Sequence, residues 1–141
     1  MRRTVAIDAS FLTAMLDQRA RTAAVADLIL QLSRENAKVI VPTPALADFL
    51  KHAGEAGPFC LDRLNKCACF QVRPFDDKAS VELARLLGEQ AAGLRDILRF
   101  DRQIVAIAKV YGAATLYADN EQVAEFGAQC GVEVKRLKDL S

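Results

Sequence analysis

The 141-residue sequence predicts a single α/β domain whose mainly parallel sheet is covered by helices on both faces. Strand-like and helical segments alternate along the chain. The run within residues 3–8 is continuously apolar and β-branched, which is typical of a strand buried on both faces of a parallel sheet. Glycine and proline are thinly spread, and no repeat, linker or low-complexity tract divides residues 1–141.

After the first strand, the spacing of apolar residues indicates helices over residues 10–18 and 22–34. Their apolar faces are supplied by Ala23, Ala26, Leu30, Ile29 and Leu32. A second strand is predicted over residues 38–41. Thr43 as N-cap and Pro44 at the first helical position then indicate a helix that runs to about Lys51.

A further helix is predicted over residues 59–65 after Gly57-Pro58, followed by a strand over 69–72 and a long helix over 76–90. The next helix, over residues 96–111, ends at Gly112 as a C-terminal cap. Its inward stripe consists of Ile97, Asp101, Ile104, Ala108 and Tyr111. A strand over 115–117, a helix over 121–129 and an edge strand over 132–134 complete the prediction.

Composition excludes some classes of protein. Hydrophobic residues make up 52% of the chain, yet no apolar run approaches the roughly 20 residues of a membrane helix. The basic N-terminus is followed by a strand-like segment that ends in Asp8, and not by a secretory apolar segment. We therefore expect a cytoplasmic protein without a membrane partner. The formal net charge of +1 gives no global argument for nucleic-acid binding.

The sequence contains Cys60, Cys67, Cys69 and Cys130. Cys67-Ala68-Cys69 does not have the spacing of a zinc knuckle, and no histidine lies near it in sequence. We interpret the four as ordinary buried thiols of a reducing compartment, with a zinc or disulfide role as the alternative. The lone histidine, His52, is predicted to be a surface residue without a catalytic role.

Candidate site residues are the four carboxylates Asp8, Asp48, Asp101 and Asp119. Asp8 and Asp119 directly follow apolar strand-like runs, and ligands of parallel α/β sheets bind beyond the carboxyl ends of the strands. Asp101 occupies the inward stripe of a helix, and Asp48 lies in the helix after a strand. If the four converge, they cannot all be ionised without a compensating cation. Acidic oxygens alone suit Mg²⁺ or Mn²⁺.

Each carboxylate also has an ordinary explanation. Asp8 and Asp119 are placed to cap the helices that follow them. The Asp101 side chain can instead be rotated out of the core to meet Arg102 or Lys109. The Asp48 side chain can instead lie on a solvated edge of its helix. Each of these alternatives explains one residue at a time. The order of the four acids along the chain, and the segments in which they stand, are more informative than any one of them.

Residues 5–12, 41–50, 100–108 and 116–119 together resemble the PIN domain, most closely the toxin ribonucleases of bacterial VapBC toxin–antitoxin pairs. The resemblance spans essentially the whole chain. It implies a three-layer α/β/α sandwich with a mainly parallel central sheet. It also implies a Mg²⁺- or Mn²⁺-dependent endoribonuclease that pairs with an antitoxin protein and forms a homodimer.

The resemblance assigns the metal site to Asp8, Asp101 and Asp119, with Asp48 as a fourth acid. Ser10 matches a hydroxyl residue that supports the first acid through a hydrogen bond. The chain departs from the family twice: the helix acid is usually Glu where Asp48 stands, and Thr or Ser usually stands at the position of Tyr117.

Two sequence features suggest binding surfaces. Arg95, Arg99, Arg102 and Lys109 recur at helical spacing beside Asp101, which suits an RNA backbone but also an ordinary solvated helix face. The first two predicted helices carry much apolar surface, which indicates either core packing or a groove for an antitoxin segment or a second copy. It is formed by Phe11, Leu12, Met15, Leu16, Val25, Leu28, Ile29 and Leu32.

The function predicted from the sequence is therefore hydrolysis of RNA phosphodiester bonds by a metal-dependent endoribonuclease, the toxin of a toxin–antitoxin pair. The alternative is a catalytically weakened module of the same fold that binds RNA or protein, which Asp48 and Tyr117 favour. A third possibility is phosphotransfer or phosphatase chemistry with Asp8 as nucleophile. It is disfavoured because Ser10 stands where a second acid is needed.

Overall fold

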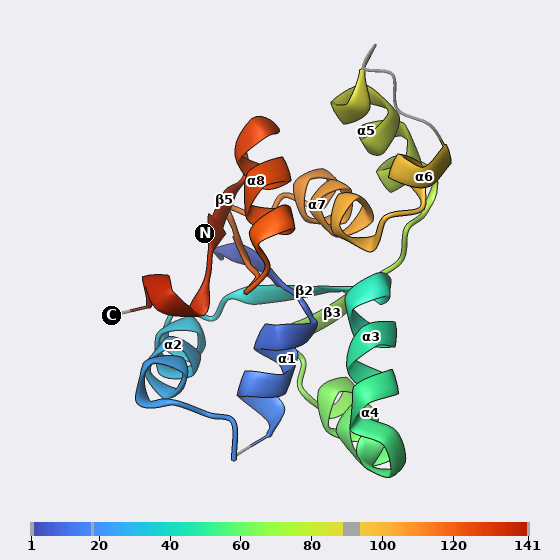
Figure 1. The fold of residues 1–141 in the computed structure, drawn as a ribbon. Coiled ribbons are helices and arrows are strands. Elements are labelled where there is room, and N and C mark those ends of the chain that lie inside the picture. Colours follow the sequence, from blue (N-terminus) through green and yellow to red (C-terminus); the bar gives the residue numbers. More distant parts are fainter. Residues whose placement is uncertain (1, 18, 89–93, 141) are drawn as a thin grey trace.

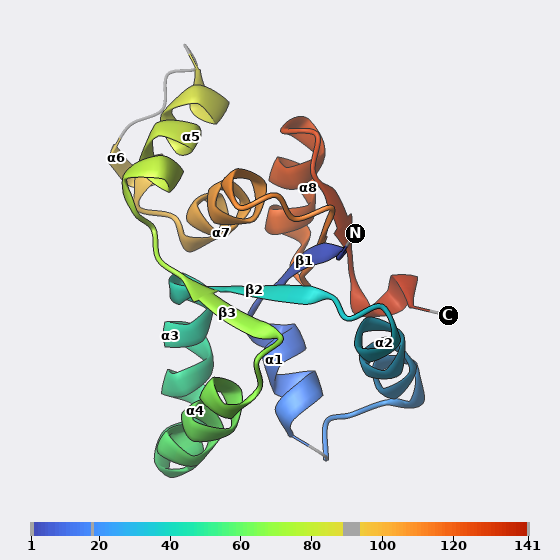
Figure 2. The same ribbon diagram turned by 180° about the vertical axis from the view of Figure 1, so that it is seen from behind.

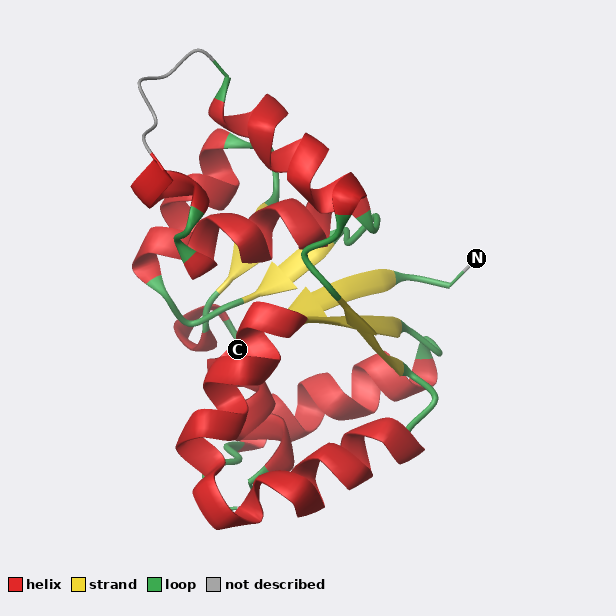
Figure 3. Cartoon of the chain, turned by 90° about the vertical axis from the view of Figure 1, so that its right-hand side faces the viewer, coloured by secondary structure: helices red, strands yellow, loops and turns green. Residues whose placement is uncertain are grey.

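The computed structural model describes residues 2–17, 19–88 and 94–140. Five strands form one sheet in the order β3-β2-β1-β4-β5, and each neighbouring pair is parallel. The strands are β1 (Thr4–Ile7), β2 (Lys38–Pro42), β3 (Phe70–Arg73), β4 (Thr115–Tyr117) and β5 (Glu133–Lys135). Their position between two helical layers is visible in the side view (Figure 3).

Helices cover both faces of the sheet. Figure 1 shows α5, α6, α7 and α8 on one side and α1, α2, α3 and α4 on the other, and the view from behind agrees (Figure 2). Their bounds are α1 (Ala9–Leu16), α2 (Ala23–Arg34), α3 (Thr43–Ala53), α4 (Gly57–Lys66), α5 (Asp77–Leu87), α6 (Leu94–Ile97), α7 (Phe100–Val110) and α8 (Glu121–Gln129). Short 3₁₀ turns lie at Gly54–Ala56 and Leu137–Asp139. In the described ranges, none of the helices combines the length and the apolar character needed to cross a bilayer.

Alternate residues of the central strands pack into two separate cores. Ala6, Ile40 and Leu116 belong to the core beneath α5, α7 and α8. Val5, Ile7, Val39, Val41 and Tyr117 belong to the core beneath α1, α2, α3 and α4. Successive side chains of a strand point to opposite faces, so a sheet between two helical layers needs apolar residues throughout. This explains the continuous apolar run of the first strand.

One predicted helix is wrong. Residues 96–111 do not form one helix, because α6 ends at Ile97 and α7 begins at Phe100. The helix is interrupted at Arg99, whose backbone is extended at φ −72° and ψ 126°. The predicted inward stripe therefore loses its first member, and Ile97 is 42% exposed. Asp101 lies in the first turn of α7.

Smaller differences concern the ends of elements. Thr43 is not the N-cap of α3: the capping position is Pro42, which makes no side-chain capping hydrogen bond, and Thr43 is already helical. The helix predicted over 59–65 begins at Gly57, and β3 and β5 start one residue later than predicted. Gly112 follows α7 with φ +79°, which confirms it as the residue that ends this helix. The helices predicted to end at residues 18 and 90 end earlier, at Leu16 and Leu87, with Asp17 and Gly88 as their C-caps. Residues 18 and 90 themselves lie outside the described residues.

Candidate functional site

The four candidate carboxylates line one cavity of about 190 Å³ at the carboxyl edge of the sheet. Asp8 follows β1 and Asp119 follows β4, and these two strands are neighbours in the sheet. In the sheet, β2 lies on one side of β1 and β4 lies on the other. The cavity is therefore at the point where the strand order reverses. Such a point is where open parallel sheets bind ligands. Helices supply the rest of the lining: Ala9, Ser10, Pro44, Ala45, Phe100, Ile104, Asn120 and Val123.

Asp8 is the most buried acid of the cavity, with 6% of its surface exposed. Its Oδ1 accepts hydrogen bonds from Ser10 Oγ at 2.6 Å and from the Phe11 amide at 3.1 Å. The second bond makes Asp8 the N-cap of α1, so the capping explanation holds for this residue. Burial raises its pKa to about 6 against the lowering effect of these hydrogen bonds, and the charge of Asp119 raises the pKa further.

Ser10 connects the two acids at the strand ends. Its hydroxyl donates to Asp8 and accepts from the backbone amide of Asp119 at 3.1 Å. Asp119 Oδ1 accepts from the Leu137 amide at 3.2 Å and lies 3.5 Å from Arg136 Nε. Asp119 is not a helix cap, because Asn120 caps α8 instead. Ser10 therefore ties the loop after β4 to the start of α1, and keeps the two carboxylates on the same cavity.

Asp101 is held by an arginine. Arg99 Nε lies 3.1 Å from Asp101 Oδ1 and Arg99 Nη2 lies 2.8 Å from Oδ2, a forked ion pair in which the Asp101 side chain is only 11% exposed. Arg99 also donates to Gln122 Oε1 at 3.2 Å. The predicted alternative partners of Asp101, Arg102 and Lys109, are engaged elsewhere: Arg102 stacks on Phe126, and Lys109 donates to the Cys130 carbonyl.

Asp48 stands at the rim of the cavity. It lies on α3 with 48% of its side chain exposed, and its Oδ1 is 3.1 Å from His52 Nδ1. The solvated helix edge considered from the sequence therefore describes this residue, although it also lines the cavity. The His52 side chain is 74% exposed, which confirms it as a surface residue, and it is the partner of Asp48.

The cavity residues suit a divalent cation by their chemistry, but their side chains are not arranged as ready ligands. Four carboxylates face two guanidinium groups, and the buried Asp8 is destabilised in its charged form by Asp119. A hard cation would relieve this imbalance. Within the described part of the chain, however, no three His, Cys, Asp or Glu side chains are grouped as a metal site. The carboxylates are instead directed to protein donors.

The predicted basic stripe is wrong as one continuous face, because the break between α6 and α7 separates its members. Arg95 is exposed on α6, whereas Arg99 faces Asp101. Arg102 lies over the Phe126 ring at 4.1 Å. Lys109 reaches the end of α8. Most of this basic charge is therefore engaged within the protein.

Sequence reasoning missed two residues of the site. Phe100 is the first residue of α7, lines the cavity and is 56% exposed, which is unusual for a large aromatic side chain. Its position next to Asp101 was the available signal. Arg136, which lies beside Asp119, follows the last strand and could not be placed without knowing the strand order.

Several expectations about other residues have clear outcomes. Tyr117 is buried in the core on the α1 side, with its ring centroid 5.5 Å from that of Phe11. Six residues of the apolar faces of the first two helices are buried core residues: Phe11, Leu12, Met15, Val25, Leu28 and Leu32. The four cysteines are free thiols, but the prediction that they are buried is wrong: Cys67 is exposed, and the other three are half-buried.

Comparison with solved structures identifies the fold. A chain of VapBC2 from Rickettsia felis, bound to a DNA fragment from its promoter, is similar with a TM-score of 0.67 at 13% identity, over 94% of this chain and 98% of that chain. DNA-bound VapBC from Salmonella typhimurium gives a TM-score of 0.65 at 14% identity, over 96% and 98%. FitAcB from Neisseria gonorrhoeae gives 0.64 at 16%, over 92% and 95%.

No protein-family model matches the sequence, and no curated protein is a recognisable relative. At these identities the similarity shows the fold alone. The chain has the PIN-like α/β/α fold of these neighbours, with a fully parallel five-stranded sheet, as the sequence predicted.

Proposed function

We propose that this protein is a metal-dependent endoribonuclease that hydrolyses RNA phosphodiester bonds. The observation that carries the proposal is the convergence of Asp8, Asp48, Asp101 and Asp119 on one cavity at the reversal point of a parallel sheet. The four come from different elements, far apart in sequence. Core packing gives no reason to collect four carboxylates in one place, whereas binding of a hard cation does.

The residues have separable roles in this proposal. Asp8, Asp101 and Asp119 would hold Mg²⁺ or Mn²⁺, with Asp48 contributing from the rim. When bound, the cation activates water and stabilises the leaving oxygen of the phosphodiester. Ser10 orients the Asp8 carboxylate and the loop that carries Asp119. Asp101 would become available as a ligand if Arg99 turned away from it, and the freed guanidinium would then be able to pair with a phosphate.

The alternative is a binding module of the same fold with weak catalysis. It is favoured by the engagement of the acids with protein donors and by the exposed position of Asp48. Such a protein would bind RNA or a protein partner at this edge without cutting. A phosphotransfer enzyme with Asp8 as nucleophile is less consistent with this site, because Ser10, which donates to Asp8, stands where a second acid is needed.

The test is cleavage of a mixed RNA pool by the purified protein with Mn²⁺, Mg²⁺ or EDTA. Asp8→Asn and Asp101→Asn are the site variants, and Asp62→Asn, on the exposed face of α4, is the matched control. Cleavage that needs the metal, is lost in both site variants and is kept in the control supports the proposal. Cleavage that survives both site substitutions overturns it. Tight RNA binding without cleavage supports the binding module.

We also propose that the protein is the toxin of a toxin–antitoxin pair and forms a homodimer. The support is the similarity to chains of VapBC and FitAB complexes over nearly the full length of both chains. Co-expression with the product of the adjacent reading frame tests the pairing. A stable complex that suppresses RNA cleavage is expected, and growth arrest should appear only when the partner is absent. Light scattering of the purified protein tests the dimer.

A further inference from the structure

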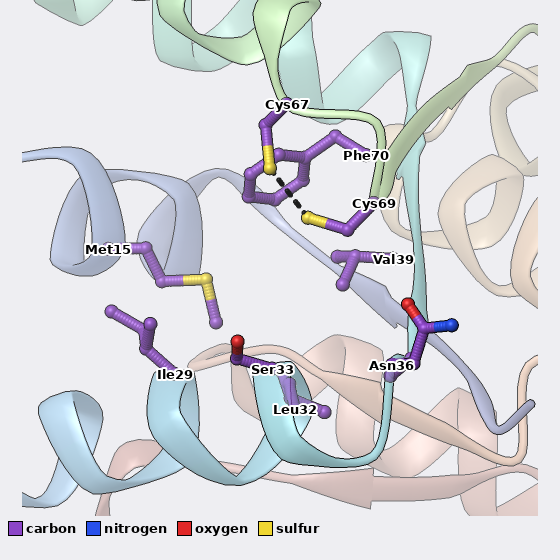
Figure 4. Close-up of a pocket in the computed structure, with 10 residues that line it drawn as sticks. Met15, Ile29, Leu32, Ser33, Asn36, Val39, Cys67, Cys69 and Phe70 are labelled. Atoms are coloured by element: carbon purple, nitrogen blue, oxygen red, sulfur yellow. Dashed lines mark hydrogen bonds between the residues drawn. The ribbon is translucent and has the colours of Figure 1, made fainter.

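Two thiols outside the acidic cavity face each other. Cys67 Sγ and Cys69 Sγ are 2.8 Å apart, and Figure 4 shows both sulfurs directed toward one another with no group between them. Both line a second cavity of about 310 Å³ between α1, α2 and the start of β3. The remaining lining is mostly apolar and includes Met15, Leu32, Val39 and Phe70.

The backbone holds the two cysteines in this arrangement. The Phe70 amide donates to the Cys67 carbonyl at 3.2 Å, which closes a turn over residues 67–70. The Cys69 carbonyl accepts from the Val39 amide at 2.8 Å and so belongs to the edge of the sheet. Two residues at the first and third positions of a closed turn lie within the Cα separation of about 4.4–6.8 Å that a disulfide spans.

We propose that Cys67 and Cys69 form a redox-active dithiol that closes to an intramolecular disulfide by exchange with a small-molecule disulfide. In the first step, the Cys67 thiolate attacks one sulfur of the external disulfide and expels one thiolate. The Cys69 thiolate then attacks Cys67 Sγ and expels the second. One external S–S bond is broken and one internal S–S bond is made. The two thiol protons end on the two released small thiols, so two electrons pass to the external disulfide.

The environments of the two thiols set the order of these steps. Cys67 is exposed, whereas Cys69 is half-buried. Burial, followed by the neighbouring Cys67 thiol, raises the pKa of Cys69. The thiolate is the nucleophile, so the more accessible Cys67 attacks first and Cys69 closes the ring. Both steps need a thiolate, so the exchange accelerates as the pH rises.

The location separates this chemistry from the acidic cavity. Cys69 precedes β3, and so lies at the amino edge of the parallel sheet, whereas the four acids lie at the carboxyl edge. A disulfide here links the residue that follows α4, Cys67, to the residue that precedes the edge strand β3, Cys69. We therefore expect oxidation to leave RNA cleavage unchanged, which makes this inference independent of the proposed nuclease function.

The test is a titration of the whole folded protein with glutathione buffers of increasing oxidised fraction, followed by acid quenching, alkylation and tryptic mapping. Cleavage after Lys66 and Lys78 places both cysteines in one peptide, because the Arg73–Pro74 bond resists trypsin, while Cys60 and Cys130 fall in two others. The expected result is that the peptide over residues 67–78 becomes unalkylated and lighter by two hydrogen atoms. Cys60 and Cys130 should remain alkylated.

Three results would overturn the proposal: a 67–78 peptide that stays fully alkylated at the highest oxidised fraction, one that carries two glutathione groups, or chains cross-linked to each other. Two variants, one of them a control, test which cysteine reacts first with glutathione. Cys69→Ser should leave a single glutathione adduct at Cys67, and Cys60→Ser should behave as the parent protein. Circular dichroism before oxidation shows that each variant is folded, and the decisive measurement on the parent protein needs no variant.

Discussion

Arg99 and Asp101 lie two residues apart and form a forked ion pair at the start of α7, with contacts of 3.1 Å and 2.8 Å. The pair exists because the helix is interrupted at Arg99, whose extended backbone lets the side chain fold back over the first turn. A helical residue two positions before Asp101 would point to another side of the helix. Arg99 is thus paired with both carboxylate oxygens of Asp101, which the proposed metal site needs as a ligand.

This relationship predicts that Arg99→Gln binds Mn²⁺ more tightly than the parent protein, by roughly 3- to 10-fold. Loss of the guanidinium frees both Asp101 oxygens and removes a positive charge from the cavity. Calorimetric titration of the RNA-free protein with Mn²⁺ measures the effect. Arg95→Gln, on the exposed side of α6, is the matched control. Weaker binding by Arg99→Gln, or an equal gain in both variants, would contradict the prediction.

We expect the free energy of unfolding to depend on pH through the Asp8 carboxyl group. Its pKa is raised from 3.8 to about 6 in the folded protein, so the folded state holds a proton that the unfolded state has lost between these values. The metal-free protein should therefore lose stability relative to Asp8→Asn as the pH rises from about 4 to about 6, by about 1–3 kcal/mol. Asparagine keeps an oxygen that can cap α1.

Urea unfolding of both proteins in EDTA, at several pH values, measures this difference. Asp62→Asn should show no comparable pH-dependent gain. A lower stability of Asp8→Asn than of the parent protein at pH 7 would show that the hydrogen bonds to Asp8 outweigh its burial. Added Mn²⁺ should stabilise the parent protein above pH 6 and have little effect on Asp8→Asn.

We expect the exposed ring of Phe100 to contribute to the binding of single-stranded RNA. The ring is 56% exposed at the edge of the acidic cavity, where a base of the proposed RNA substrate would be able to stack on it. Stacking of a base on an aromatic ring is worth about 1–3 kcal/mol, so Phe100→Ala should weaken binding by roughly 5- to 150-fold. Fluorescence anisotropy with a short labelled RNA in Ca²⁺ measures affinity without turnover. Phe59→Ala, 65% exposed on α4, should bind as the parent protein does.

We expect a packing defect when Gly127 is replaced by a larger residue. A Cβ added there would lie 2.5 Å from Val134 Cγ2, because α8 passes close over β5. Gly127→Ala should destabilise the protein by about 1–3 kcal/mol, although alanine is normally the better helix former. At Gly57 an added Cβ meets only an ordinary contact of 3.6 Å with Leu50, so Gly57→Ala should be neutral or stabilising. Thermal unfolding separates the two, and equal effects would refute the packing argument.

Periodicity and strand-end position were sufficient to predict most of the fold. The strand over Thr115–Tyr117 and the helix over Glu121–Gln129 agree with the prediction residue for residue, because each is a short apolar run or an amphipathic segment with clear flanks. The error at residues 96–111 has a specific cause. Apolar spacing continues through Arg99, and no glycine or proline marks the interruption, so the pattern resembles one helix.

The candidate site could be predicted only in part. Strand ends indicate Asp8 and Asp119, because parallel strands bring their carboxyl ends to one edge. The contacts that hold these acids depend on distant segments: Asp119 accepts from the Leu137 amide, and Ser10 donates to Asp8 while accepting from the Asp119 amide. The orientation of such side chains follows from tertiary packing, which local spacing does not encode.

The long sequence separation of the cavity's parts has a consequence during protein synthesis. Asp8, Asp48 and Asp101 are synthesised before Asp119, and Asp119 is held by Arg136 and Leu137, which are synthesised later still. The strand β5, which orders that segment against β4, is synthesised after the other four strands of the described sheet. A growing chain therefore lacks the contacts that hold Asp119 until translation has passed residue 137, and any activity of this edge begins only after that point.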